Sequence, residues 1–365
     1  MKEGWKTLKI EDICEILDAQ RKPVSKKDRH SGCYPYYGAT GIQDYVDAYI
    51  FDGRYLLVGE DGAKWGASDR TAFIVEGKCW VNNHAHILKL NHNVVDTFVE
   101  YYLTFKDLNE YITGAIVPKL TQQALRGIPI PIPPLSEQEG IVAELDCLSD
   151  VIEKQKRQLK ELDNLAQAIF YDMFGDPITN EKGWKVKPLG DACGFQQGEQ
   201  VPIEEQFEVY EEGMVRFLRI VDFTQGNEKP RYVMCKNTKH ILQNEQVAIV
   251  RYGTPGFVCF GKSGLIANNL FKIIPKSEDI AFRFLVYWLY SDAFQSVIKD
   301  NQYGVALQAI KFSTIKDINL IIPPINLQQE FASKIEAIEK QKELIKQSLS
   351  ETETLFNSRM DYYFN

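Results

Sequence analysis

Hydrophobic residues recur at alternating spacings of four and three along residues 141–173. One polar residue, Gln155, interrupts this stripe. A helix lying on a globular core usually carries a wider stripe, whereas a narrow one is typical of a coiled coil. The pattern therefore predicts a long helix within residues 133–175 that packs on another helix. Its seam comprises Ile141, Leu145, Leu148, Ile152, Leu159, Leu162, Ala166, Ile169 and Met173.

A second stretch, within residues 323–365, has a similar stripe that Lys342 and Thr352 interrupt. Each pattern spans about 39 residues, or roughly 58 Å of α-helix. Two copies of one unit on a single chain commonly pack about a pseudo-two-fold axis, so we expect the two helices to form an antiparallel coiled coil. The second seam comprises Phe331, Ile335, Ile338, Ile345, Leu349 and Phe356.

Both predicted helices follow the same kind of junction. The sequences IPIPPLSEQE and LIIPPINLQQ place their proline pairs, Pro133-Pro134 and Pro323-Pro324, 190 positions apart. Ser136 and Glu139 have the spacing of a capping box, which predicts that Ser136 caps the first helix. Asn326 and Gln329 form a weaker version of the same pattern.

The duplication extends over the remaining segments, 1–132 and 176–322. Gly-Trp-Lys occurs at the start of each, and Asn82-Asn83 resembles Asn268-Asn269 before an apolar run. Asparagine pairs at a strand entrance also satisfy turns, so this match can reflect shared architecture alone. Both segments contain short apolar runs separated by glycine and end in small helical patterns. The sequence predicts an α+β protein with two globular domains, two long helices and an internal pseudo-two-fold repeat.

Charge is distributed unevenly along the 365 residues, whose net charge is −8. Lys and Arg number 16 against 17 Asp and Glu in residues 1–132, and 17 against 17 in 176–322. The helical segments are acidic, with 4 against 9 and 5 against 7. A nucleic-acid binder acting alone is usually basic, so we expect a partner to share phosphate neutralisation if DNA is bound. No apolar run or leader pattern suggests a membrane, and we expect a cytoplasmic protein.

The sequence contains no recognisable catalytic constellation. It lacks a phosphate-binding loop, an HExxH motif and a GxSxG elbow. Seven scattered cysteines without CxxC support neither a disulfide framework nor a zinc ribbon. His84 and His86 form an isolated HxH whose further metal ligands nothing identifies. We therefore predict no catalytic residue, no metal and no cofactor for this chain.

Recognition chemistry is concentrated in the first segment. Cationic side chains on flexible stems contact phosphates, amides and hydroxyls read base edges, and aromatic rings stack, although a charged loop is often only solvated. Candidates for DNA contact here are Arg21, Lys22, Lys26, Lys27, Arg29, Tyr37, Thr40, Gln43, Lys64 and Trp65.

Fewer candidates occur in the second segment. Arg216 and Arg219 can equally form ion pairs with the acidic run at 204–212, so both interpretations stay open. The remaining candidates are Arg251, Tyr252, Gln302 and Tyr303.

The arrangement resembles the specificity subunit of type I restriction–modification systems. The resemblance covers essentially the whole chain and rests on IPIPPLSEQ with its helix, YYGATGIQDY, FDGRYLLVGEDGA, NNHAHIL, RFLRIVDF and IPPINLQQ. It implies two target recognition domains that each read half of a bipartite double-stranded DNA target, separated by spacer helices that hold two methyltransferase subunits. Those partners would bind S-adenosylmethionine and methylate adenine, and motor-nuclease subunits can join them.

Two alternatives remain from the sequence. The chain could be the specificity subunit of a related phage-defence or single-polypeptide methyltransferase system. It could also be a structural coiled-coil scaffold without a DNA role. The resemblance implies that the chain is a non-catalytic subunit, whether it serves a type I system or a related methyltransferase system.

Overall fold

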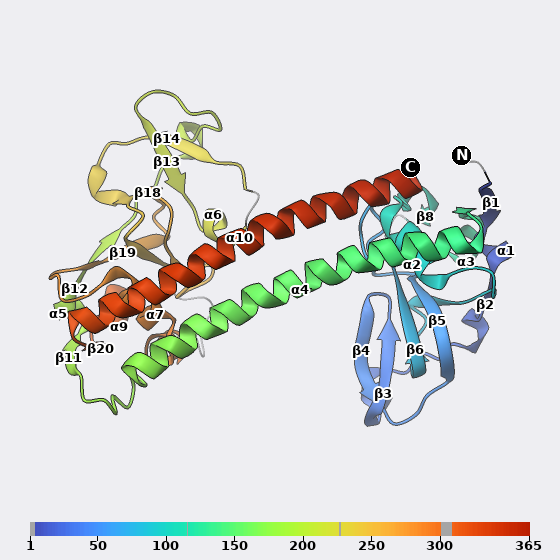
Figure 1. Cartoon of the computed structure of the whole chain (residues 1–365), viewed down its shortest axis with the longest axis horizontal. Helices are drawn as coiled ribbons and strands as arrows, with labels where there is room; N and C mark the ends of the chain where they lie inside the picture. Colours follow the sequence, from blue (N-terminus) through green and yellow to red (C-terminus); the bar gives the residue numbers. More distant parts are fainter. Residues whose placement is uncertain (1–3, 115, 226–227, 301–308) are drawn as a thin grey trace. The chain divides into compact units, whose positions relative to one another are not determined.

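The chain folds into two compact units (Figure 1). The computed structural model describes residues 4–114, 116–225, 228–300 and 309–365. The first unit comprises Met1–Arg157 and Lys346–Asn365, and the second comprises Gln158–Ile345. Each of the two long helices therefore contributes residues to both units. The predicted α+β class is confirmed.

A six-stranded sheet in the order β2-β7-β5-β6-β3-β4 forms the centre of the first unit. Strand β5 has a continuous apolar run because both of its faces are covered. Leu56 and Val58 lie in one core with helix α2, and Leu57 lies in the core on the opposite face. The strands are β2 (Cys14–Ile16), β3 (Ser31–Gly38), β4 (Gly41–Val46), β5 (Phe51–Gly59), β6 (Ala72–Val81) and β7 (Ala85–Leu90).

Smaller elements complete this unit. Strand β1 pairs antiparallel with β10, and β8 pairs with β9. Helix α2 buries Phe98, Val99, Tyr102 and Leu103, which share one helical face, against the sheet. The elements are β1 (Lys6–Lys9), α1 (Ile10–Ile13), α2 (Asp96–Phe105), β8 (Ile112–Thr113), β9 (Lys119–Leu120), α3 (Gln122–Gly127) and β10 (Pro129–Ile132), with 3-10 turns η1 (Asp18–Gln20), η2 (Lys26–Asp28) and η3 (Asn109–Tyr111).

The second unit contains two four-stranded sheets, in the orders β12-β19-β16-β17 and β14-β13-β18-β15, and the pair β11-β20. Its strands are β11 (Lys185–Pro188), β12 (Cys193–Gln197), β13 (Met214–Leu218), β14 (Arg231–Met234), β15 (Ile241–Leu242), β16 (Val247–Val250), β17 (Val258–Cys259), β18 (Gly264–Ile266), β19 (Leu270–Pro275) and β20 (Asn319–Ile322). Its short helices are α5 (Leu189–Ala192), η4 (Ile203–Glu205), α6 (Val221–Thr224), η5 (Thr238–His240), α7 (Phe282–Tyr290), α8 (Asp292–Asp300) and α9 (Phe312–Ile315).

The two units repeat one framework of strand pairings. Strand β2 pairs with β7 and β7 with β5 in the first unit, as β12 pairs with β19 and β19 with β16 in the second. The outer pair β1-β10 corresponds to β11-β20, each beside its proline junction. The predicted internal repeat is thus present in the backbone hydrogen bonds.

Helices α4 (Leu135–Phe174) and α10 (Ile325–Phe364) lie inside the predicted intervals 133–175 and 323–365. Their contacts run antiparallel within each unit. In the first, Glu144 pairs with Arg359 and Lys156 with Glu353. In the second, Phe174 packs on Phe331 and Asp163 pairs with Lys342. No helix in the described part of the chain is long and apolar enough to span a membrane.

The seam residues are buried or half-buried. The ends of both helices also pack into the globular cores, which the pattern did not predict. Phe170 and Phe174 are almost fully buried in the core of the second unit, whereas Ile169 and Met173 are only partly buried. Met360 and Phe364 similarly enter the core of the first unit. Each helix end is therefore an integral part of a globular core.

The predicted capping box is wrong. The amide of Gln138 donates to the carbonyl of Pro134 at 3.1 Å, so α4 begins one residue before Ser136. Gln138 instead ties the junction together: its Nε2 donates to Pro133 O at 2.9 Å, and its Oε1 accepts from Val95 N at 2.8 Å. Proline has no side-chain acceptor that could cap the helix, and the buried glutamine joins the helix start to the segment entering α2.

Gln328 does the same in the second unit. Its Nε2 donates to Pro323 O at 2.8 Å and to Asp279 O at 2.9 Å, and its Oε1 accepts from Ala281 N at 2.8 Å. The repeated proline junctions thus contain a repeated buried glutamine, which the sequence reading missed.

Candidate nucleic-acid interface

The loop between β2 and β3, residues 21–30, is fixed by its neighbours. Trp80 Nε1 donates to Lys22 O at 2.6 Å, and Val24 N donates to the Tyr36 hydroxyl at 3.0 Å. Arg29 donates to Val24 O at 3.1 Å, pairs with Asp44 at 3.2 Å and lies 4.2 Å from the Tyr36 ring centroid. Arg29 therefore holds the loop in place, and only 16% of its side chain is exposed.

Three lysines project from this anchored loop. Lys22, Lys26 and Lys27 are exposed, and no ion pair joins them to another described residue. Because the backbone is held by Trp80 and Tyr36, binding an anion here would order little more than the side chains.

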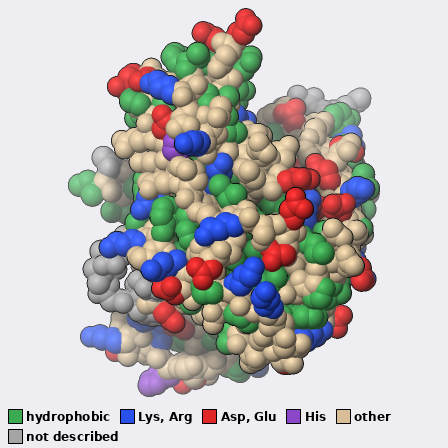
Figure 2. Space-filling view, turned by 90° about the vertical axis from the view of Figure 1, so that its left-hand side faces the viewer, with side chains coloured by type: hydrophobic (Ala, Val, Ile, Leu, Met, Phe, Trp, Pro, Cys, Tyr) green, Lys and Arg blue, Asp and Glu red, His purple; other side chains and the backbone are tan. Residues whose placement is uncertain are grey.

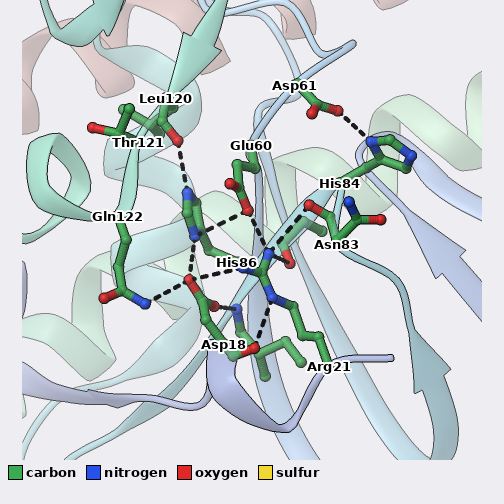
Figure 3. Close-up of polar contacts among 12 residues, drawn as sticks. Asp18, Arg21, Glu60, Asp61, Asn83, His84, His86, Leu120, Thr121 and Gln122 are labelled. Atoms are coloured by element: carbon green, nitrogen blue, oxygen red, sulfur yellow. Dashed lines mark hydrogen bonds and ion pairs between the residues drawn. The ribbon is translucent and has the colours of Figure 1, made fainter. Parts of the chain in front are cut away.

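Arg21 points inward, toward a buried polar cluster (Figure 3). Its guanidinium pairs with Glu60 at 2.5 Å and Asp18 at 3.3 Å and donates to Ala85 O at 2.8 Å. Only 12% of its side chain is exposed. The prediction that Arg21 contacts phosphate is therefore wrong, since its donors are occupied inside the unit.

His86 lies at the centre of the cluster and is fully buried. Its Nδ1 is 2.6 Å from Asp18 Oδ2 and its Nε2 is 2.8 Å from Leu120 O. A carbonyl oxygen only accepts, and Asp18 also accepts from Gln122 Nε2 at 2.9 Å. Both ring nitrogens thus face oxygen atoms, and these contacts hold the ring in place from two sides.

Asp18, Glu60 and His86 place possible ligand atoms within 4.8 Å of one another, in the manner of a metal site. Two cations already neutralise the carboxylates, however, because Lys119 pairs with Glu60 at 2.7 Å and Arg21 binds both acids. We therefore interpret the group as a structural ion-pair network.

Hydrogen bonds keep both carboxylates ionised. Burial alone would raise the pKa of Asp18, but hydrogen bonds from His86 and Gln122 hold it below its ordinary value. Burial would also raise the pKa of Glu60, and hydrogen bonds from Lys119 and Arg21 lower it.

His84 does not join this group. Its Nδ1 contacts Asp61, away from His86 (Figure 3). The two histidines of the HxH motif therefore belong to different environments, because His84 lies in the turn before β7 whereas His86 lies within that strand.

The hairpin of β3 and β4 carries three further candidates. Thr40 is exposed in the turn, and Gln43 is exposed on β4, where its Oε1 accepts from Asn82 Nδ2 at 3.1 Å. Tyr37 is half-buried, with its ring 6.0 Å from that of Phe73. Thr40 and Gln43 are thus accessible to a ligand, and Tyr37 mainly supports the sheet.

Lys64 and Trp65 are neighbours in the loop after β5, but their side chains lie in different environments. Lys64 is exposed, whereas Trp65 is only 7% exposed and lies in the core. The Nε1 of Trp65 donates to Gly59 O at 3.1 Å. The prediction that Trp65 stacks on DNA is wrong, because the indole fills the space beneath this loop.

In the second unit, Arg216 and Arg219 share one buried carboxylate. Arg216 pairs with Asp222 at 2.7 Å and Arg219 with the same group at 3.0 Å. Burial would raise the pKa of Asp222, and hydrogen bonds from Arg219 and Arg216 lower it. The alternative pairing with the acidic run at 204–212 is therefore wrong; Arg231, not considered from sequence, pairs with Glu208 there.

Arg251 and Tyr252 follow strand β16. Arg251 Nε donates to Ile310 O at 3.3 Å, and the exposed Tyr252 donates its hydroxyl to Asn268 Oδ1 at 3.2 Å. Asn268 Nδ2 in turn donates to Gln200 Oε1 at 3.2 Å. Gln302 and Tyr303 lie outside the described residues.

The two asparagine pairs are offset by one position in the repeat. After the parallel pairing of β3 with β6, Asn82 N donates to Tyr37 O at 3.0 Å. After the matching pairing of β13 with β18, the donor to Leu218 O is Ala267 at 2.9 Å. Asn83 thus corresponds to Asn268, and Asn82 corresponds to Ala267. The sequence comparison was wrong by one residue, because only strand register fixes the equivalence.

The surface of the second unit is electrostatically mixed. Figure 2 shows Lys and Arg side chains interspersed with Asp and Glu on the face toward the viewer. This agrees with the equal numbers of basic and acidic residues in 176–322. Charge alone therefore does not mark a DNA surface on this face.

A family model described as "Type I restriction modification DNA specificity domain" matches residues 2–164 and 181–354, one match for each repeat. The chain belongs to this family. It is the DNA-recognition subunit of a type I restriction–modification complex, which agrees with the duplicated units and the long helices.

Individual members of the family align along nearly the whole chain. A putative type I restriction enzyme specificity subunit of Haemophilus influenzae is 27% identical, covering 98% of this chain and 93% of that protein. The MjaIX specificity subunit of Methanocaldococcus jannaschii is 24% identical, with coverages of 92% and 87%.

The fold is also similar to a solved structure. The crystal structure of a type I system S subunit from M. genitalium has a TM-score of 0.64 and 14% identity, with coverages of 98% and 95%. Family membership does not favour the scaffold without a DNA role or the single-polypeptide alternative. The specificity-subunit family works on DNA together with other restriction–modification subunits.

Proposed function

We propose that the first unit reads one half of a bipartite DNA target through the surface formed by the loop 21–30, the β3–β4 turn and Lys64. The observation that carries this proposal is the group of three exposed lysines on an anchored loop. Lys22, Lys26 and Lys27 would neutralise phosphates, which positions the unit without reading sequence. Thr40, Gln43 and Lys64 are the exposed side chains available for base edges.

The second unit would read the other half-site with a different set of groups. Tyr252, Asn268 and Gln200 form a connected polar surface there. In the first unit Asn83 occupies the position of Asn268, but within the described residues its side chain makes no comparable hydrogen bond. Shared strands with unlike surface groups favour two different half-sites.

Modification and cleavage would be carried out by partners. We propose that the chain itself is non-catalytic, that two methyltransferase subunits bind S-adenosylmethionine and methylate adenine, and that motor-nuclease subunits can join. The net negative charge of both helical segments supports the proposal that partner subunits bind there. Each unit exposes apolar side chains on α4 and α10: Val151 and Leu355 in the first, Leu165 and Leu344 in the second.

The test replaces Lys22, Lys26 and Lys27 together by alanine and measures DNA binding by the complex with methyltransferase subunits over a salt series. We expect weaker binding to all sequences and a slope of log affinity against log salt that is smaller by about 2–3, roughly one per lost phosphate contact. Replacing Lys6, Lys9 and Lys89, which are exposed elsewhere on the same unit, should leave both unchanged. An unaltered slope in the first variant would place the footprint elsewhere.

A further inference from the structure

Two side-chain amides form a relay at the edge of the first unit. Asn82 is 2% exposed, and its Nδ2 donates to the Oε1 of the exposed Gln43 at 3.1 Å. Its Oδ1 accepts from the backbone amide of His84 at 2.8 Å. A buried residue thus holds an exposed one.

The relay sets the orientation of both amides. A backbone N–H can only donate, so the atom of Asn82 facing His84 must be oxygen and the atom facing Gln43 must be nitrogen. Gln43 must then present Oε1 to Asn82. Its Nε2 accordingly lies on the other side, and it makes no hydrogen bond within the described part of the chain.

Gly38 provides the space that this orientation needs. A Cβ added to Gly38 would lie 2.1 Å from Gln43 Nε2 and 2.4 Å from its Cδ. The backbone of Gly38 lies outside the left-handed region, so glycine is not required there for its φ angle. The absence of a side chain at Gly38 leaves room for the amide of Gln43.

The amide lies beside the anchored loop. Asp44, the next residue on β4, pairs with Arg29, which holds the lysine loop. Thr40 is exposed in the turn of the same hairpin. Phosphate-binding lysines and an oriented amide therefore occur on adjoining segments, as direct readout requires.

We infer that Gln43, oriented by Asn82 over Gly38, is a specificity-determining residue that donates a hydrogen bond from Nε2 to a base acceptor. The inference rests on the proposed function of this surface. A single outward donor selects bases with an acceptor in the major groove, namely purine N7, guanine O6 or thymine O4. Bases that present an amino group at that position would be rejected.

The isosteric change Gln43→Glu tests this polarity. It keeps an oxygen for the bond from Asn82 and replaces the outward donor by an acceptor. Methylated positions would be mapped in DNA modified by the complete complex containing each variant. We expect one position of one half-site to change preference toward adenine or cytosine, which offer an amino group, by roughly tenfold or more. The other half-site and the spacer should stay the same.

A second variant, Gly38→Ala, displaces the amide without altering it. We expect relaxed discrimination at the same position and no preference for the opposite polarity. Gln123→Ala, an exposed glutamine on α3 of the same unit, should leave the motif unchanged. Melting temperatures of all three would show that the proteins are folded.

The outcomes distinguish a failure of the proposed function from a failure of the role inferred for Gln43. If the wild-type complex has no sequence-specific motif, the proposed function fails. If it has a motif that neither variant alters, or that both weaken equally at all positions, Gln43 does not read a base and the inference is overturned.

Discussion

Arg251 in the second unit occupies the position that Glu60 occupies in the first. Glu60 N donates to His84 O and its carbonyl accepts from Leu120 N, both at 2.8 Å. Arg251 N donates to Asn269 O at 2.8 Å, and its carbonyl accepts from Ile310 N at 2.9 Å. The backbone position is the same and the charge is opposite, so the repeated framework does not determine the polar chemistry placed on it.

This equivalence gives a matched pair of mutations. Glu60→Gln should lower the free energy of unfolding of the first unit by about 3 kcal/mol, because Arg21 and Lys119 lose a buried partner. Arg251→Gln should cost less than about 1 kcal/mol, since its side chain makes only the 3.3 Å bond to Ile310 O among the described residues. Hydrogen exchange of peptides from each unit measures both; equal effects would contradict the ion-pair interpretation.

The cost of Glu60→Gln should also depend on pH. The native pKa of Glu60 lies below its ordinary value of 4.5, so its stabilisation is present above pH 4.5 and is lost as the pH falls through the native pKa. Urea unfolding of the wild type and the variant should therefore converge in acid. A difference that persists at low pH would show that packing, not charge, causes the loss.

Glu100 on α2 should have the opposite effect on the pH dependence of stability, because its pKa is raised. Burial raises its pKa to about 7, with Arg70 opposing the shift and Asp96 and Asp146 adding to it. The folded protein then binds a proton that the unfolded chain releases, so stability should fall as the pH rises from 4.5 to 7, by at most about 3 kcal/mol.

Glu100→Gln removes this titration. The variant should equal the wild type near pH 4 and be more stable at pH 8, as measured by urea unfolding. Glu139→Gln, an exposed glutamate on α4, is the control and should leave the pH profile unchanged. A wild-type profile in Glu100→Gln would rule out Glu100 as its source.

The junction glutamines should be required for the stability of their own units. Gln138→Ala leaves Val95 N and the carbonyls of Pro133 and Asn93 without their partner, which we expect to cost about 2–3 kcal/mol in the first unit. Gln328→Ala should do the same in the second. Exchange that quickens equally in both units after either mutation would contradict separate roles.

Lengthening both paired helices should change the spacer between the two DNA half-sites. Gln155 donates to the Ser348 hydroxyl at 2.8 Å, so seven residues inserted after Gln155 and seven before Ser348 keep the seam in register. The insertion adds about 10 Å of helix. We expect the methylated motif to gain roughly three base pairs of spacer at 3.4 Å each, with unchanged half-sites. Insertion into α4 alone should instead break the register and destabilise the protein.

Part of the site was hidden from the sequence by long-range ion pairing. Arg21 and Lys22 are neighbours in one basic run, yet Arg21 is held by Asp18 and Glu60 whereas Lys22 is exposed. Trp65 and Lys64 diverge in the same way. Composition identified the loops, but it could not separate the side chains that build a core from those that face solvent.

The sequence by itself determined the two helices, the duplication and the absence of recognisable catalytic motifs, because hydrophobic period and repeat spacing are local properties of the chain. The tertiary structure decided which groups remain available for binding. The partners of Arg21, Trp65 and Arg216 are set by strand register and packing, and the offset between Asn82 and Asn268 is visible only in the backbone hydrogen bonds. A one-residue shift along a strand reverses the direction of a side chain, so function at this surface depends on register that composition does not contain.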